Sequence, residues 1–138
     1  MDLENRIALI YKANAEIGKH FYLKTLDFRT YKSLFIQLKP ESSGKDLESI
    51  VVTLDEAFTE AENQGFLHMV FSFKDVTYFG DLGMSVIMAH AISLEAKGGQ
   101  IVFCDVNSKI RQVMTILNLD EAIEIYSTEE ELLNNKLT

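Results

Sequence analysis

Apolar residues recur along the chain at two spacings, which predict an alternation of helices and strands. In residues 3–17 and 45–64 they recur at every third or fourth position, a spacing typical of amphipathic helices. A further helix is predicted from about Leu82 to Lys97, where a glycine pair ends it. Two short runs, FLHMVFSF and QIVFCDV, are apolar on both faces and predict buried strands of a partly parallel sheet.

The remaining segments complete an α/β pattern. FYLKTLDF and KSLFIQLK predict two strands joined as a hairpin around residues 29–32. AIEIY predicts a short last strand, and Thr128 with Glu131 has the spacing of a capping box that would begin a final helix. Because helices and strands then alternate, we expect a mostly parallel sheet with helical crossovers.

The first predicted helix has an apolar stripe that a lone surface helix would not keep exposed. The stripe consists of Leu3, Ile7, Ile10 and Ile17, and Gly18 is the expected end of the helix. We treat residues 1–18 as a helical extension and residues 19–138 as the domain proper. The stripe would either cover a sheet face or edge of its own domain or form a homodimer, and we prefer the homodimer.

Composition and charge narrow the possible partners. A chain of 138 residues with 47% hydrophobic residues is long enough for one domain with a core. Its 13 Lys and Arg against 21 Asp and Glu give a net charge of −8, which disfavours nucleic acid and favours a basic partner protein. The start, MDLENR, does not resemble a signal peptide, and no apolar stretch is long enough for a membrane span, so a cytoplasmic protein is expected.

Residues for catalysis or metal binding are sparse. The single cysteine, Cys104, lies in an apolar strand and is expected to be buried, and His20, His68 and His90 are scattered. We interpret His68 as a half-buried strand residue and His90 as a weak candidate for a partner contact. With neither a nucleophile–base set nor ligand spacing in the sequence, we expect no enzyme, no metal and no cofactor.

The segment VTYFGDLGMS, residues 76–85, predicts a strand-to-helix turn. Such turns direct backbone N–H groups toward one point, where anions commonly bind. Asp81 is a suitable N-cap residue for the helix that follows, because its carboxylate can accept from the N–H groups of the first turn.

From about Phe21 to Leu133 the chain resembles the STAS domain, the module of bacterial anti-sigma factor antagonists. GGQIVFCDVNSKIRQVMTILNLDEAIEIYST is the most specific part, and the phrase VT-aromatic before a glycine and an apolar helix also agrees. The part around LFIQLKPESSG agrees only in layout. The resemblance implies a mostly parallel sheet of four or five strands with helices packed mainly on one side.

The resemblance also implies a mechanism. In the family, a turn of the form Asp-Ser-Ser-Gly or Asp-Thr-Ser-Gly opens the central helix, and a partner kinase, itself the anti-sigma factor, phosphorylates the second hydroxyl residue. The unmodified form binds the kinase, and the phosphorylated form releases it. When the turns are matched at Gly83, the acceptor position falls on Leu82, which has no hydroxyl. Ser85, one turn further on, is a weaker candidate acceptor.

Three hypotheses follow. The first is a regulatory module that resembles an anti-sigma factor antagonist and binds an anti-sigma factor or another serine kinase-like regulator without phosphorylation at the usual site. The second is a STAS subunit of a larger stress-signalling or lipid-transport assembly, and the third is a small-ligand or anion-binding STAS domain. For the first, the expected partner surface comprises Gly80, Asp81, Leu82, Gly83, Met84 and Ser85.

Overall fold

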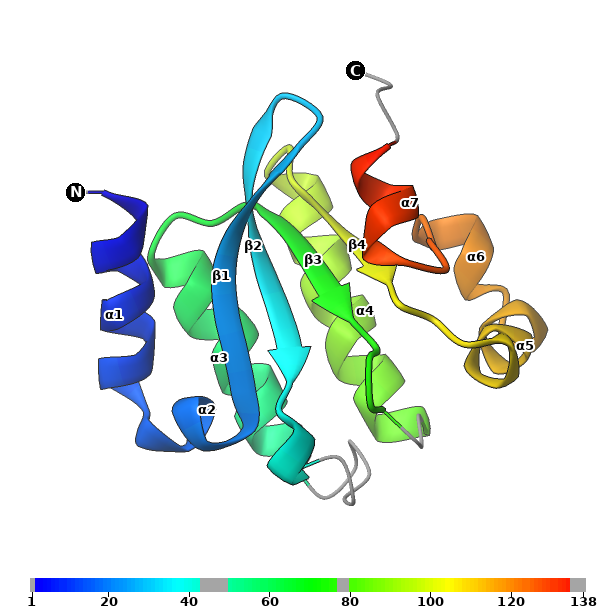
Figure 1. Cartoon of the computed structure of the whole chain (residues 1–138), viewed down its shortest axis with the longest axis horizontal. Helices are drawn as coiled ribbons and strands as arrows, with labels where there is room; N and C mark the ends of the chain where they lie inside the picture. Colours follow the sequence, from blue (N-terminus) through cyan, green and yellow to red (C-terminus); the bar gives the residue numbers. More distant parts are fainter. Residues whose placement is uncertain (1, 43–49, 77–79, 135–138) are drawn as a thin grey trace.

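The computed structural model describes residues 2–42, 50–76 and 80–134. They form a four-stranded sheet of order β1-β2-β3-β4 (Figure 1). The strands are β1 (Phe21–Phe28), β2 (Tyr31–Leu38), β3 (His68–Ser72) and β4 (Gln100–Cys104). β1 pairs antiparallel with β2, as the predicted hairpin requires, and β2, β3 and β4 are mutually parallel. The predicted mostly parallel α/β sheet is therefore confirmed.

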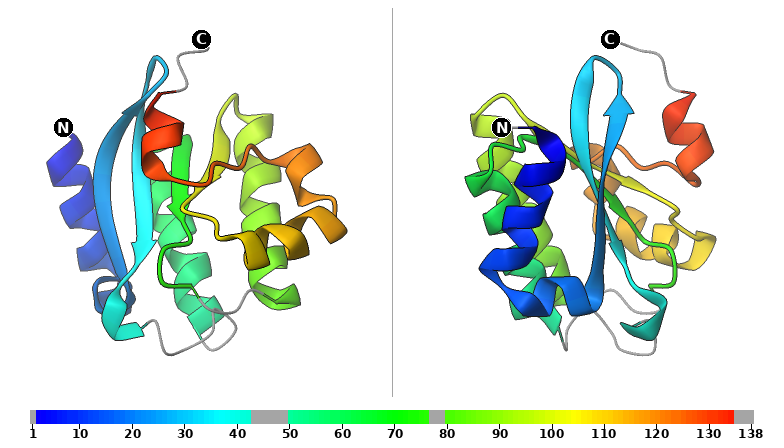
Figure 2. Two further views of the ribbon diagram at one scale, coloured as in Figure 1. Left: turned by 45° about the vertical axis from the view of Figure 1, so that its right-hand side comes forward. Right: turned by 60° about the vertical axis from the view of Figure 1, so that its left-hand side comes forward.

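Helices cover the two faces of the sheet unequally (Figure 2). α1 (Leu3–Ala13), α3 (Val51–Asn63) and α4 (Asp81–Ala96) lie on one face, and α7 (Glu129–Leu133) lies on the other. The larger core, under α1, α3 and α4, contains the inward side chains of alternate strand residues such as Ile36 and Phe71. A smaller core on the opposite face includes Phe35 and Val70, and Leu132 of α7 covers it. The strands are apolar on both faces because both faces are buried.

The N-terminal segment differs from its prediction in two ways. It forms two helices, α1 and α2 (Ala15–His20), because Asn14 adopts an extended backbone and its side chain accepts from Glu16 N at 2.9 Å, which caps α2. The predicted end at Gly18 is wrong, since α2 continues to His20 and β1 follows directly.

The apolar stripe of this segment packs on its own domain. Ile10 and Ile17 are fully buried in the larger core, and Leu3 and Ile7 pack against it. The Tyr11 hydroxyl accepts from the backbone N–H of Leu23 at 2.8 Å, so α1 also covers part of the β1 edge. The structure therefore supports the first alternative, in which the stripe covers its own domain, and the preferred homodimer stays a prediction.

The chain after β4 is less regular than predicted. Asn107 caps α5 (Ser108–Ile116) by accepting from Ile110 N at 2.8 Å. The predicted strand AIEIY is reduced to a single bridge between Phe103 and Ile125, and α6 (Leu119–Ala122) begins just before it. A short 3-10 turn, η1 (Pro40–Ser42), follows β2.

The starts of two other helices agree in part with their predictions. Thr128 caps α7 by accepting from Glu131 N at 2.9 Å, which confirms the predicted start of the final helix. A helix was predicted for residues 45–64. Its predicted start falls within residues 43–49, which lie outside the described residues, and α3 begins at Val51.

Candidate functional site

The turn between β3 and α4 is described on both sides of residues 77–79, which lie outside the described part. On the strand side, Phe73 N donates to Cys104 O at 2.9 Å, and Val76 N donates back to Phe73 O at 3.0 Å. Val76 is buried in the larger core. The chain therefore leaves β3 through a tight turn whose ends, Phe73 and Val76, are buried and whose middle residues, Lys74 and Asp75, are exposed.

On the helix side, the N-cap of α4 lies one residue earlier than expected. Gly80 has an extended backbone and is the N-cap, and its carbonyl accepts from Met84 N at 3.0 Å. Asp81 is the first helical residue, so the prediction of Asp81 as N-cap was wrong. Its carboxylate still lies in the first turn, where the helix dipole favours negative charge.

The six predicted surface residues divide by exposure. Asp81, Leu82 and Ser85 are exposed, and the Leu82 side chain is 59% exposed although it is apolar. Gly80 is half-buried, Gly83 is buried, and Met84 is half-buried and packs against the larger core. Asp81, Leu82 and Ser85 are therefore the ones that a partner could reach most directly.

A polar cluster that the sequence did not reveal lies at the carboxyl ends of β3 and β4. Asp105 accepts from the buried Ser72 hydroxyl at 2.6 Å and from Glu129 N at 3.1 Å. Its backbone has a φ of 57°, a left-handed value that Asp adopts more readily than most residues. Asp105 thereby joins the end of the sheet to the start of α7. A hollow of about 450 Å³ lies beside this cluster and is lined by Gln37, Phe73, Lys74, Asp75, Asp105, Asn107, Ser127 and Glu129.

The cysteine and histidines have structural contacts. Cys104 is buried, and its burial, together with the carboxylate of Asp105, raises the pKa of its thiol far above the ordinary value. His90 contacts Asp55 through Nε2 at 2.7 Å and stacks on Phe58 with ring centroids 5.1 Å apart. These contacts hold His90 between α3 and α4, which weakens the case for His90 as a partner contact.

His68 is half-buried, as expected, and lies flat against the Tyr31 ring with centroids 3.7 Å apart. Its Nδ1 atom is buried without a hydrogen-bond partner in the described part of the chain, and burial lowers its pKa. In the same part of the chain, no cluster of His, Cys, Asp and Glu has the arrangement of a metal site.

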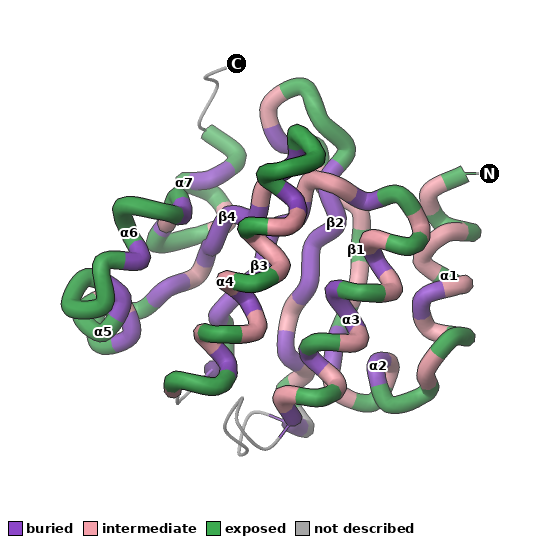
Figure 3. The backbone as a smooth tube through the Cα atoms, turned by 180° about the vertical axis from the view of Figure 1, so that it is seen from behind, coloured by how far each residue is buried: buried purple, intermediate pink, exposed green. Residues whose placement is uncertain are grey.

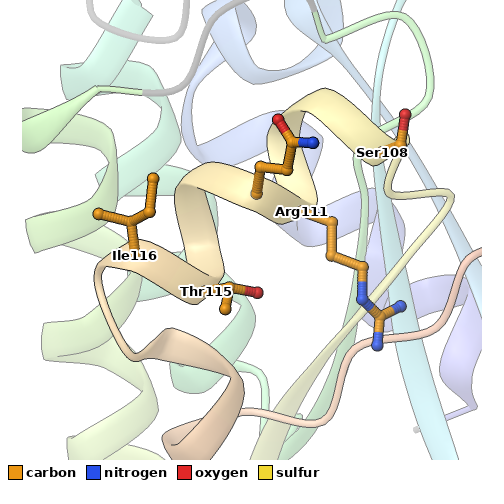
Figure 4. Close-up of a pocket in the computed structure, with 5 residues that line it drawn as sticks. Ser108, Arg111, Thr115 and Ile116 are labelled. Carbon is orange, nitrogen blue, oxygen red and sulfur yellow. The ribbon is translucent and has the colours of Figure 1, made fainter.

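A second hollow, of about 500 Å³, lies on α5 (Figure 4). Its lining residues all come from that one helix: Ser108, Arg111, Gln112, Thr115 and Ile116. Arg111 donates to Ser127 Oγ at 3.4 Å, and Ile116 is 78% exposed. Since one helix supplies every lining side chain, the hollow is a shallow surface feature rather than an enclosed ligand site.

The sheet order, the helices chiefly on one face and the turn that opens α4 define a class of small α/β domain. The family model described as the STAS domain matches residues 24–132, and the chain belongs to this family. An anti-sigma F factor antagonist from Paenibacillus polymyxa is 25% identical over 96 residues, which cover 70% of this chain and 80% of the relative. This chain is an anti-sigma factor antagonist-like STAS domain.

Solved structures agree with this fold. The NMR structure of the protein TM1081 from Thermotoga maritima has a TM-score of 0.65 at 22% identity, over 84% of this chain and 87% of that one. The phosphorylated form of the Bacillus cell fate determinant SpoIIAA has a TM-score of 0.58 at 19% identity, over 80% of this chain and 94% of that one. At these identities the likeness supports the fold alone.

The same comparisons bear on the class of activity. The name of the Paenibacillus relative describes a regulator that antagonises an anti-sigma factor, rather than an enzyme. As for membranes, the helices in residues 2–42, 50–76 and 80–134 include none with the length and apolar character needed to cross a bilayer.

Proposed function

We propose that this chain binds an anti-sigma factor through the start of α4, and that phosphorylation at the usual acceptor position does not control the binding. The observation that carries the proposal is Leu82, which occupies the second helical position of α4 with 59% of its side chain exposed. In the family pattern this position has a hydroxyl. Leu82 offers an apolar anchor and has no oxygen to phosphorylate.

The surroundings of Leu82 support a binding role. Asp81 and Ser85 are exposed beside it, so an apolar side chain lies within polar groups, a common arrangement at interaction hot spots. Complete burial of a leucine against a partner contributes about 1.5–3 kcal/mol. The net charge of −8 favours a partner with a basic surface. By occupying the anti-sigma factor, the chain would free a sigma factor in bacterial transcription or stress signalling.

The binding test uses purified serine kinase-type anti-sigma factors of the source organism and isothermal titration calorimetry. Leu82→Glu should weaken binding at least about tenfold, because it replaces the apolar anchor with a charge. Leu133→Glu is the matched control, since Leu133 is an exposed leucine on α7, on the other face of the sheet. Equal affinities for the wild-type protein and Leu82→Glu would refute the proposed surface.

The modification test adds ATP to the same kinases and maps phosphate by mass spectrometry. The wild-type chain should gain no phosphate between residues 76 and 86, which includes Ser85. Leu82→Ser restores the hydroxyl of the family pattern, so it should become a substrate and lose affinity once it is phosphorylated. Stoichiometric phosphate in this segment of the wild-type chain would contradict the proposal.

A further inference from the structure

Apolar residues surround α4 instead of being confined to the side that faces the core. Ile87 and Leu94 are buried, but Leu82 and Ile92 are 59% and 64% exposed. A helix that is apolar on all sides is typical of one covered on both sides. Figure 3 shows the exposed side of α4 next to α3 on the helical face of the molecule.

The exposed residues of α4 form a ridge of distinct shape. Leu82, Ser85, Ala89 and Ile92 are all exposed and follow one another at intervals of three or four residues, so they lie along one side of the helix. At a rise of about 1.5 Å per residue, Leu82 and Ile92 are about 15 Å apart along the axis. The large side chains stand at the two ends, and the small Ser85 and Ala89 lie between them. Small residues at a crossing point allow two helices to approach within about 8 Å.

The charge around this ridge is strongly acidic. The carboxylates within α3 and α4 are Asp55, Glu56, Glu60, Glu62, Asp81 and Glu95, and neither helix has a Lys or Arg within its bounds. Lys97, just after α4, is paired with Glu62. A second copy of the chain would bring two such acidic faces together, whereas a basic segment would be attracted to one.

We infer that the element of the anti-sigma factor that docks here is a basic amphipathic helix lying across α4. Its axis crosses the ridge at Ser85 and Ala89, its apolar side chains fill the space between Leu82 and Ile92, and its Lys or Arg residues face Asp81 and Glu95. This inference rests on the proposed function and adds the shape and charge of the partner element. It extends the contact two turns beyond the Gly80–Ser85 surface.

The test uses the anti-sigma factor that binds the wild-type chain in the titration described above, and it measures the affinity of this factor for variants of the chain. Ala89→Phe blocks the crossing point and Ile92→Lys removes the far apolar end, so each should weaken binding at least about tenfold. The matched controls are Ala8→Phe on α1 and Ile116→Lys on α5, both at exposed positions, and they should bind within about twofold of wild type. Thermal melting of every variant checks that the fold is intact.

Charge is tested with Asp81→Asn combined with Glu95→Gln. The affinity of the wild-type chain should fall several-fold between about 50 and 300 mM salt, and the double variant should show a smaller fall. Photo-crosslinking from position 85 should attach to a helical segment of the partner rich in Lys and Arg. Attachment to a strand, or to an acidic segment, would refute the inference.

The outcomes separate the two proposals. If Leu82→Glu abolishes binding but Ala89→Phe and Ile92→Lys do not, the proposed function stands and this inference fails. If none of the three changes the affinity, or if no anti-sigma factor binds the wild-type chain, both fail. A wild-type dimer in light scattering that Ala89→Phe converts to a monomer would assign the ridge to a second copy and overturn the inference.

Discussion

Substitution of Ile10 by alanine tests whether α1 is part of the folding unit. Ile10 is fully buried in the larger core, so the change removes apolar groups from a packed interior. The lost groups correspond to about three methylene units, which are worth about 2.4 kcal/mol in transfer free energy. The cavity left behind adds to this cost, and the total should be about 2–5 kcal/mol of unfolding free energy.

Ile116→Ala is the matched control, because it makes the same chemical change at a side chain that is 78% exposed. It should change the unfolding free energy by no more than about 0.5 kcal/mol. Urea denaturation of both variants gives the two values, and an unchanged m-value shows that the surface exposed on unfolding is the same. Domains of this size have about 5–15 kcal/mol of stability, so the Ile10→Ala loss is large but measurable.

Two results would refute the reasoning. The first is a loss below about 1 kcal/mol for Ile10→Ala, which would mean that α1 does not pack as described. The second is a stability that rises with protein concentration in the wild type but not in Ile10→Ala, because this would show that the stripe is buried between two copies.

Two further predictions concern titratable groups. Burial raises the pKa of Glu124, but hydrogen bonds from Arg29 and Tyr126 outweigh it and hold the pKa below its usual value. The ionised carboxylate therefore stabilises the fold above its unfolded-state pKa, and this stabilisation is lost as the pH falls through the folded-state pKa. In urea denaturation, the wild-type protein should be more stable than Glu124→Gln at neutral pH, and this difference in unfolding free energy should shrink in acid. An advantage that is constant with pH would contradict this. Because burial raises the pKa of Cys104 and shields its sulfur, a thiol reagent should modify it only as fast as the protein unfolds, and rapid modification of the native protein would show an accessible thiol.

The sheet was predictable because its strands have an unusual pattern. β3 and β4 are apolar on both faces, and only a parallel strand between two covered faces requires this. The last strand was overpredicted for a reason that the sequence does not display. In AIEIY, α6 includes Ala122 and is capped by Ile123, and the backbone then meets β4 at one point, where Phe103 N donates to Glu124 O and Tyr126 N donates to Phe103 O around Ile125.

The candidate site was predictable only in outline. The turn GDLG was recognised as the start of a helix, but the expected N-cap, Asp81, was one residue too late, because Gly80 takes the extended cap conformation. Periodicity could not show which side of α4 is exposed, since apolar residues occur all around it. Asp105 was missed because a single aspartate after a strand has no sequence signature, and its contacts come from Ser72 and Glu129, which are distant in the chain.

The hydrogen bond between Tyr11 and Leu23 has a practical consequence for how this protein can be shortened. The family match begins at residue 24, inside β1, so a fragment cut at that boundary would lose Ile10, Ile17 and the first residues of the edge strand. It would also uncover backbone N–H and C=O groups that can pair with the edge of another molecule. The part of the chain that the family model matches is therefore smaller than the unit that packs together, and a purification tag or fusion partner should be attached before α1 and not replace it.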